Sequence, residues 1–304
     1  MSLPAHTAAQ DLLKRWPFSG RPRLRDGLVV VSALWLAMAA SCAPSLSSFR
    51  PAHVPQKGHV HVTAGADVSV PTGSAGDTVD AGKTLARASR SRELTQSERD
   101  QLFDAGVLFT ANPPSLLQHF LIAYAPLART EVSLRYAGGA WRLGGRYQIW
   151  EQGNGHDWDL TAGVGLSRQS VGIPLSEVIN LLEINDYERW GFDLPLAIGR
   201  RGSWYRAWGG PRLMYTRGDG SVRLNLPATN SSAARTETAA AEANGFYWGG
   251  QAGLAIGYQH VFLGFELTLV QFSGEATIGL NDRTRTVDVS TFVVYPGLAL
   301  MVEL

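Results

Sequence analysis

Residues 59–70 read HVHVTAGADVSV and alternate between two kinds of side chain along their whole length. One face of this stretch is apolar, with Val60, Val62, Ala64, Ala66, Val68 and Val70. The opposite face carries His59, His61, Thr63, Asp67 and Ser69. A period of two is that of a β-strand whose two faces meet different surroundings. The stretch therefore predicts a strand with one apolar and one polar environment.

The same alternation recurs along the rest of the chain and predicts about ten strands. The further candidates are 120–124, 131–136, 141–149, 157–167, 189–199, 205–216, 246–259, 263–269 and 298–304. Short connections (125–130, 151–156, 200–203 and 259–260) alternate with mostly long ones (71–115, 169–187, 217–245 and 274–287). The exception is the tight turn at Gly138 and Gly139. Short and long connections thus fall at opposite ends of one antiparallel barrel.

The polar face carries charges of both signs, and this indicates which face points inward. We expect a charge network in the lumen made of Asp67, Arg135, Arg142, Arg146, Asp159, Asp193, Arg206, Arg212 and Glu266. Such charges cannot face hydrocarbon, but they can pair in a narrow lumen. Aromatic residues cluster at both ends of the apolar face, as they do at the two interfaces of a membrane. A lipocalin-type barrel, with its apolar face inward, needs only about eight strands.

These features resemble bacterial outer-membrane β-barrel proteins over residues 58–304. The resemblance implies an all-β fold, a transmembrane antiparallel up-and-down barrel of about ten strands with short helices in its extracellular loops. It also implies short periplasmic turns, long extracellular loops and both termini in the periplasm. The partners it implies are outer-membrane lipid and the barrel-assembly machinery.

The N-terminus predicts export. Arg21, Arg23 and Arg25 precede an apolar run at 27–40, which is too short for a comfortable membrane span. The sequence Ala39-Ala40-Ser41-Cys42 resembles the bacterial lipobox, and this resemblance implies lipidation of Cys42 and contact with the lipoprotein-sorting machinery. We then expect a leader at 1–41 and a lipidated N-terminus and linker at 42–57, rich in proline. An ordinary signal peptide and a short membrane anchor are the alternatives.

The long connections predict two helices and one mobile segment. Residues 97–104 begin with Ser97 placed to cap Asp100, and residues 176–184 carry an apolar surface. Residues 228–244 are rich in Ala, Thr, Ser, Asn and Glu and predict a mobile surface loop within 217–245.

Chemistry is harder to find than architecture. A net charge of +1 argues against nucleic-acid binding. His119 is the histidine nearest the long-loop end, where Asp186, Glu188 and Asp219 approach it in one hypothesis. The pair His59-x-His61 has no evident further ligand, so we assign no catalytic residue, metal or cofactor. The sequence favours a structural, adhesive or ligand-binding role with an unidentified extracellular ligand. A small channel, and a hydrolase or protease at the outer mouth, are the alternatives.

Overall fold

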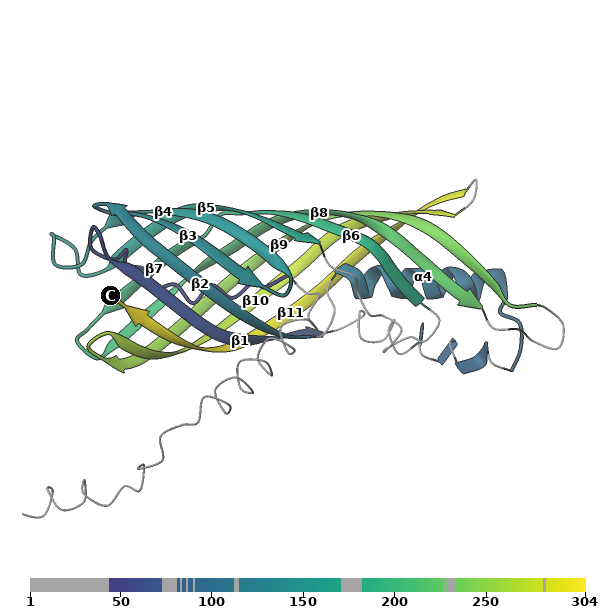
Figure 1. Ribbon diagram of the computed structural model, residues 1–304, viewed down its shortest axis with the longest axis horizontal. Helices are drawn as coiled ribbons and strands as arrows, with labels where there is room; N and C mark the ends of the chain where they lie inside the picture. The colour runs from purple at the N-terminus through teal and green to yellow at the C-terminus, as the bar shows by residue number, and fades with distance from the viewer. Residues whose placement is uncertain are drawn as a thin grey trace, which may run out of the picture. The chain divides into compact units, whose positions relative to one another are not determined.

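The computed structural model describes residues 44–72, 81–82, 84–85, 87–89, 91–111, 115–170, 182–226, 228, 233–280 and 283–304. All of them belong to one compact unit, Met38–Leu304. Within them, the chain forms a closed antiparallel barrel with ten strand positions (Figure 1). The strands are β1 (Val60–Thr72), β2 (Ser115–Leu127), β3 (Thr130–Ala137), β4 (Ala140–Trp150), β5 (Asp159–Ser170), β6 (Leu182–Asp193), β7 (Leu196–Arg201), β8 (Tyr205–Leu226), β9 (Arg235–Tyr258), β10 (Val261–Leu280) and β11 (Arg283–Glu303). The predicted fold class is confirmed.

The barrel is an up-and-down meander in which each strand pairs with its neighbour in sequence. It closes where β1 pairs with β11, with Asp67 opposite Gly297. β6 and β7 share one position between β5 and β8, because Pro195 has no N–H for the ladder. The chain stays in register there, since the Leu194 N–H donates to the Leu213 carbonyl at 3.1 Å and the Pro195 carbonyl accepts from Gly163 at 2.9 Å.

Connections divide between the two ends as the sequence predicts. The end with the C-terminus carries the β2–β3, β4–β5, β7–β8 and β9–β10 turns, and we call it the short-turn end. The other end, the long-strand end, includes the tight turn between β3 and β4. Gly138 (φ 55°) and Gly139 (φ 76°) both lie in the left-handed region, as a two-residue hairpin of the primed type requires.

Five strands run beyond the others at the long-strand end and form what we call the extension: 182–190 of β6, 217–226 of β8, 235–245 of β9, 271–280 of β10 and 283–291 of β11 (Figure 1). The predicted mobile loop at 217–245 is therefore wrong for most of its length, and most of 274–287 is also strand. The inward residues Ala239, Ala241 and Ala243 are too small to show a clear hydrophobic alternation. Their small size suits a sheet that packs closely on a helix.

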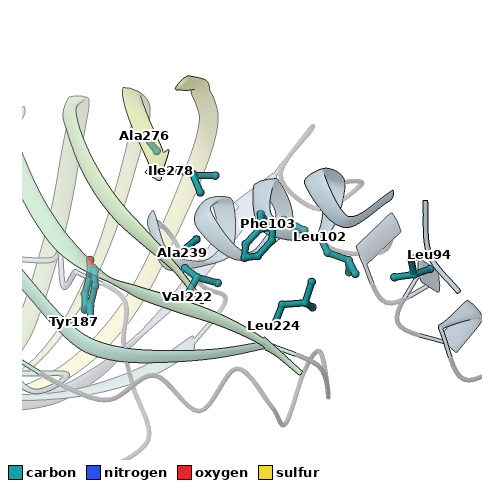
Figure 2. Close-up of a cluster of buried hydrophobic side chains, with 10 residues drawn as sticks. Leu94, Leu102, Phe103, Tyr187, Val222, Leu224, Ala239, Ala276 and Ile278 are labelled. Atoms are coloured by element: carbon teal, nitrogen blue, oxygen red, sulfur yellow. The ribbon is translucent and has the colours of Figure 1, made fainter. Parts of the chain in front are cut away.

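Helix α4 (Gln96–Ala111) packs against the extension and confirms the helix predicted at 97–104. Leu102 and Phe103 are buried against Val222, Leu224 and other apolar side chains of the strands (Figure 2). The cap differs from the prediction, because Thr95 and Glu98, not Ser97 and Asp100, exchange hydrogen bonds at the N-terminus.

The second predicted helix, at 176–184, lies largely outside the described residues. Its last three residues belong to β6, so the structure contradicts a helix there.

Candidate functional site

The inner face of the barrel is polar and closed to solvent. Asp67, Glu131 and Glu266 point inward and are 0% exposed. Their outward neighbours are apolar and open, with Val132 46% and Phe265 51% exposed. The predicted parity is therefore the observed one, with charges inside and apolar side chains outside.

Residues 44–57, which we call the plug segment, run through this lumen. Leu46 and Phe49 are 0% exposed, and the burial is continuous from Leu46 to Val54. Side chains from β1, β3, β4, β10 and β11 bond to the segment, and these strands surround it from several sides. The lumen is consequently filled by the chain's own N-terminal part.

Glu266 on β10 holds the backbone of the plug segment. Its carboxylate accepts hydrogen bonds from the backbone N–H groups of Ser48 and Phe49, the latter at 2.8 Å. The Ser48 hydroxyl donates to it at 3.1 Å, and the Trp208 indole N–H donates at 2.9 Å. A buried carboxylate is costly unless its oxygens are satisfied. The plug segment supplies most of the donors that Glu266 needs.

Glu131 on β3 joins the plug segment to β4. Arg50 of the plug segment donates to one carboxylate oxygen, and Arg146 on β4 donates to the other at 2.7 Å. Arg146 also donates to the Pro51 carbonyl at 2.7 Å. One guanidinium thus bonds at once to a strand carboxylate and to the plug backbone.

The C-terminal part of the plug segment is fixed near the short-turn end. His53 lies 3.1 Å from the Glu303 carboxylate, which also accepts from Arg206 at 2.8 Å. The Val54 N–H donates to the Gln148 side-chain oxygen at 2.9 Å. These contacts place residues 53–54 beside the last residues of β4 and β11.

The N-terminal part of the plug segment lies toward the long-strand end. The Ser45 hydroxyl donates to Asp67 at 2.9 Å, and Arg135 donates to the Ser47 carbonyl. The Phe49 ring stacks on His119 with 4.9 Å between centroids. A Cβ at Gly297 would lie 2.6 Å from this ring, so only glycine leaves room for it.

The direction of the plug segment differs from the predicted linker. The sequence predicts that 42–57 joins a lipid anchor to the barrel entrance, with both termini on one side. Instead, the chain passes down the lumen from the long-strand end, turns at Gly58 (φ 86°) and begins β1. Prolines exclude this segment from a strand ladder, but its buried backbone groups bond to lumen side chains instead.

Apolar layers above and below the charges complete the filling. Toward the short-turn end lie Ala52, Trp208, Phe262 and Met301, and toward the long-strand end lie Leu46, Leu117, Tyr247, Val293 and Tyr295. The small cavities between them, of about 10 and 40 Å³, each have several arginines in their lining.

All nine predicted network residues face the lumen, and the structure gives several of them partners outside the predicted set. Asp193 binds Arg142 at 2.7 Å and Arg212 at 3.0 Å, both on other strands. Asp67 lies 3.9 Å from Arg135, and Asp159 lies 3.3 Å from Arg201. Glu266, Arg146 and Arg206 are bonded as described above.

Three central members of the network, Arg50, Glu131 and Glu303, are not among the predicted residues. Glu131 and Glu303 stand on the predicted polar parity, which was a usable signal. Arg50 lies in a segment without periodicity, and nothing in the sequence places it in the lumen.

The outer face divides into two zones along the four longest strands. On β9, the outward side chains from Phe246 to Tyr258 are aromatic, aliphatic or glycine. Beyond Phe246 they turn polar, with Asn244 and Glu242, while the inner face becomes apolar. β10 shows the same reversal, from Phe265 and Leu269 to Ser273 and Glu275.

Among the described residues, the side chains considered for a hydrolase or protease do not form a catalytic site. His119 stacks on Phe49, whereas Glu188 lies on the outer face and accepts hydrogen bonds from Arg168 and Trp190. In the same residues, no group of three or more His, Cys, Asp or Glu is placed to hold a metal ion. None of the helices in this part of the chain is long and apolar enough to cross a membrane. Cys42 and the predicted leader lie outside the described residues.

Comparison with known proteins gives only distant likenesses. No family model and no curated protein matches the chain. Its structure is similar to that of Ail, the attachment invasion locus protein of Yersinia pestis, with 11% identity and a TM-score of 0.25 over 82% of this chain and 100% of that one. The outer membrane protein OprG from Pseudomonas aeruginosa has 12% identity and a TM-score of 0.33, with coverages of 83% and 99%. The CymD monoaromatic hydrocarbon channel has 8% identity and a TM-score of 0.35, over 88% of this chain and 96% of that one. At these scores, the likenesses assign no function to this chain.

Proposed function

We propose that this chain is an outer-membrane β-barrel protein that does not conduct and that presents its extension at the cell surface, in a structural, adhesive or ligand-binding role. The observation that carries the proposal is the division of the outer face into an apolar band and a polar extension. Leu263, Phe265 and Leu298 are 51–56% exposed within one continuous apolar band. Soluble proteins rarely expose so large an apolar surface to water.

The height of the band supports a bilayer. Phe246 and Tyr258 are twelve residues apart on β9. At about 3.3 Å per residue and a strand tilt of roughly 40°, they span about 30 Å along the barrel axis. That is the thickness of a hydrocarbon core. Exposed aromatic side chains mark both limits, with Phe246 (42%) and Trp248 (52%) at one and Tyr258 (75%) at the other.

The extension supports the orientation. Its outward residues, among them Glu242, Ser273 and Glu275, belong in water, and its inner face packs on α4. Outer-membrane barrels place their long connections outside the cell and their short turns in the periplasm. The extension and α4 would then form an ordered surface about the outer mouth.

The filled lumen argues for a closed barrel. A second candidate function, a small channel, draws on the arginine-lined cavities beside the plug segment. Passage of solutes would require the plug segment to leave, and with it the donors of Glu266 and Glu131. The closed form therefore agrees better with the bonding of the lumen.

Lipidation of Cys42 stays a prediction, and the plug segment adds a condition to it. Pro44 lines a cavity with Ala137 and Ala140, which flank the tight turn at the long-strand end. Two residues of chain reach about 7 Å at most. With the plug segment in place, a lipid on Cys42 would belong to the outer leaflet and not to the periplasmic one. Mass spectrometry of the mature N-terminus tests the modification, and an unmodified start elsewhere would remove it.

Thiol labelling of intact cells tests the proposal. Glu242→Cys on the extension should react with a membrane-impermeant maleimide on intact cells. Asn154→Cys in the β4–β5 turn should react only after the outer membrane is opened. The unaltered chain, with its single cysteine, is the control for background labelling. The reverse pattern would invert the orientation, and labelling of neither site before opening would refute surface display.

A further inference from the structure

The two lumen cavities share three arginines, Arg135, Arg142 and Arg212. The smaller cavity, about 10 Å³, has room for a single water. The larger, about 40 Å³, has room for several water-sized atoms and is also lined by Ser45, Ser167 and Arg189. Both cavities have side chains of the plug segment and of the strands in their lining.

Positive charge is in excess around these cavities. Six arginines line them: Arg50, Arg135, Arg142, Arg146, Arg189 and Arg212. Three carboxylates pair with members of this set: Asp67, Glu131 and Asp193. Glu266, bonded by N–H and O–H groups of Ser48, Phe49 and Trp208, adds a fourth negative charge nearby, so the arginines outnumber the carboxylates by two. A buried cation without its counter-charge is strongly unfavourable, so the layer lacks negative charge.

Donors in the same layer also lack acceptors. The Nε–H groups of Arg135 and Arg212 are buried and have no hydrogen-bond partner. Arg135 is 3% exposed and Arg212 is 2% exposed, so bulk water does not satisfy them. Both side chains line the larger cavity. Buried polar groups in proteins are nearly always bonded to protein, ordered water or an ion.

We propose that the larger cavity binds one small inorganic anion, a halide or a compact oxyanion, held by Arg135 and Arg212 with Arg142 beside them. The anion supplies both the missing acceptor and the missing negative charge. Because Arg135 also donates to Ser45 and Ser47, the anion stabilises the plug segment in the lumen. The inference concerns the lumen alone and holds whether or not the extension has a surface role.

Bromide locates the anion directly. Crystals of the full chain grown in detergent with bromide should show an anomalous peak between Arg135 and Arg212. In solution, thermal unfolding in detergent micelles is followed while chloride, bromide, nitrate or sulfate replaces gluconate at constant ionic strength. Gluconate is too large for the cavity. Above its Kd, the preferred anion should lower the unfolding equilibrium constant about tenfold for each tenfold rise in concentration.

Arg212→Met tests the site, because Asp193 keeps its bidentate partner Arg142 in that variant. Arg206→Met is the matched control, since Arg206 is a lumen arginine that lines neither cavity. We expect the anion response to be lost in the first variant and kept in the second. Water alone in the cavity, or equal stabilisation by gluconate, would overturn the site even if Arg212→Met failed to fold. A bromide peak without stabilisation in solution would mean an adventitious ion only.

Discussion

Removing the Glu266 carboxylate should release the plug segment. In Glu266→Ala, the backbone N–H groups of Ser48 and Phe49 and the Trp208 indole N–H lose their common acceptor. Hydrogen bonds to a charged group contribute about 1.5–3 kcal/mol each, and they are not additive when they share one acceptor. We therefore expect a loss of about 4 kcal/mol in the free energy of unfolding. Glu266→Gln keeps one acceptor oxygen and should lose roughly half as much.

Chymotrypsin separates release of the plug segment from general weakening of the barrel. Phe49 is 0% exposed in the intact lumen, so cleavage after it reports an open plug segment. The matched control is Asp193→Asn, because the ion-pair partners of Asp193, Arg142 and Arg212, lie on strands and not in the plug segment. It should lower stability in urea without exposing Phe49. Unchanged cleavage in Glu266→Ala, together with unfolding within about 0.5 kcal/mol of the unaltered chain, would refute the role of Glu266.

Three further predictions test the outer face and the extension. Leu254→Arg, in the apolar band, should cost about 2–4 kcal/mol on folding into lipid vesicles, whereas Ser273→Arg on the extension should be nearly neutral; equal costs would contradict the band. Leu102→Ala should raise hydrogen exchange in α4 through a local loss of about 2–5 kcal/mol while the barrel amides stay protected, and unchanged exchange in α4 would argue against its packing. The hydrogen bond from Arg92 lowers the pKa of Glu98 from 4.5 to about 2. The ionised cap therefore stabilises α4 above pH 4.5, and this stabilisation is lost as the pH falls toward 2. Glu98→Gln should abolish this pH dependence of hydrogen exchange in α4, measured after correction for the intrinsic exchange rates.

The side chains of each strand that face the lumen could be predicted from sequence, because the two faces of the barrel differ sharply in polarity. Val132, Leu134 and Tyr136 alternate with Glu131, Ser133 and Arg135, and hydrocarbon accepts only the first set. Placing acids and arginines on one parity was enough to predict that Asp193 and Arg142 would share the lumen. It was not enough to rank Glu131, whose importance comes from a partner, Arg50, far away in sequence.

The plug segment could not be predicted, because its fold depends on the barrel around it. Residues 44–57 show no period and contain Pro44, Pro51 and Pro55, which is the composition of a linker. Its structure comes from side chains such as Glu266 and Arg146, each distant in sequence. The extension escaped prediction for a related reason. Its inner alanines pack in a cluster that includes Leu102 and Phe103 of α4, and no local signal in the sequence indicates that packing.

The conductance of the full-length protein in a planar bilayer tests the central claim most directly. The claim tested is that the barrel spans the outer membrane and that its own plug segment, fixed by Glu266 and Glu131, closes the lumen. We expect insertion without steady single-channel current, because a barrel of this size filled by side chains leaves no continuous water path. Long-lived openings of uniform conductance in the unaltered protein would contradict it.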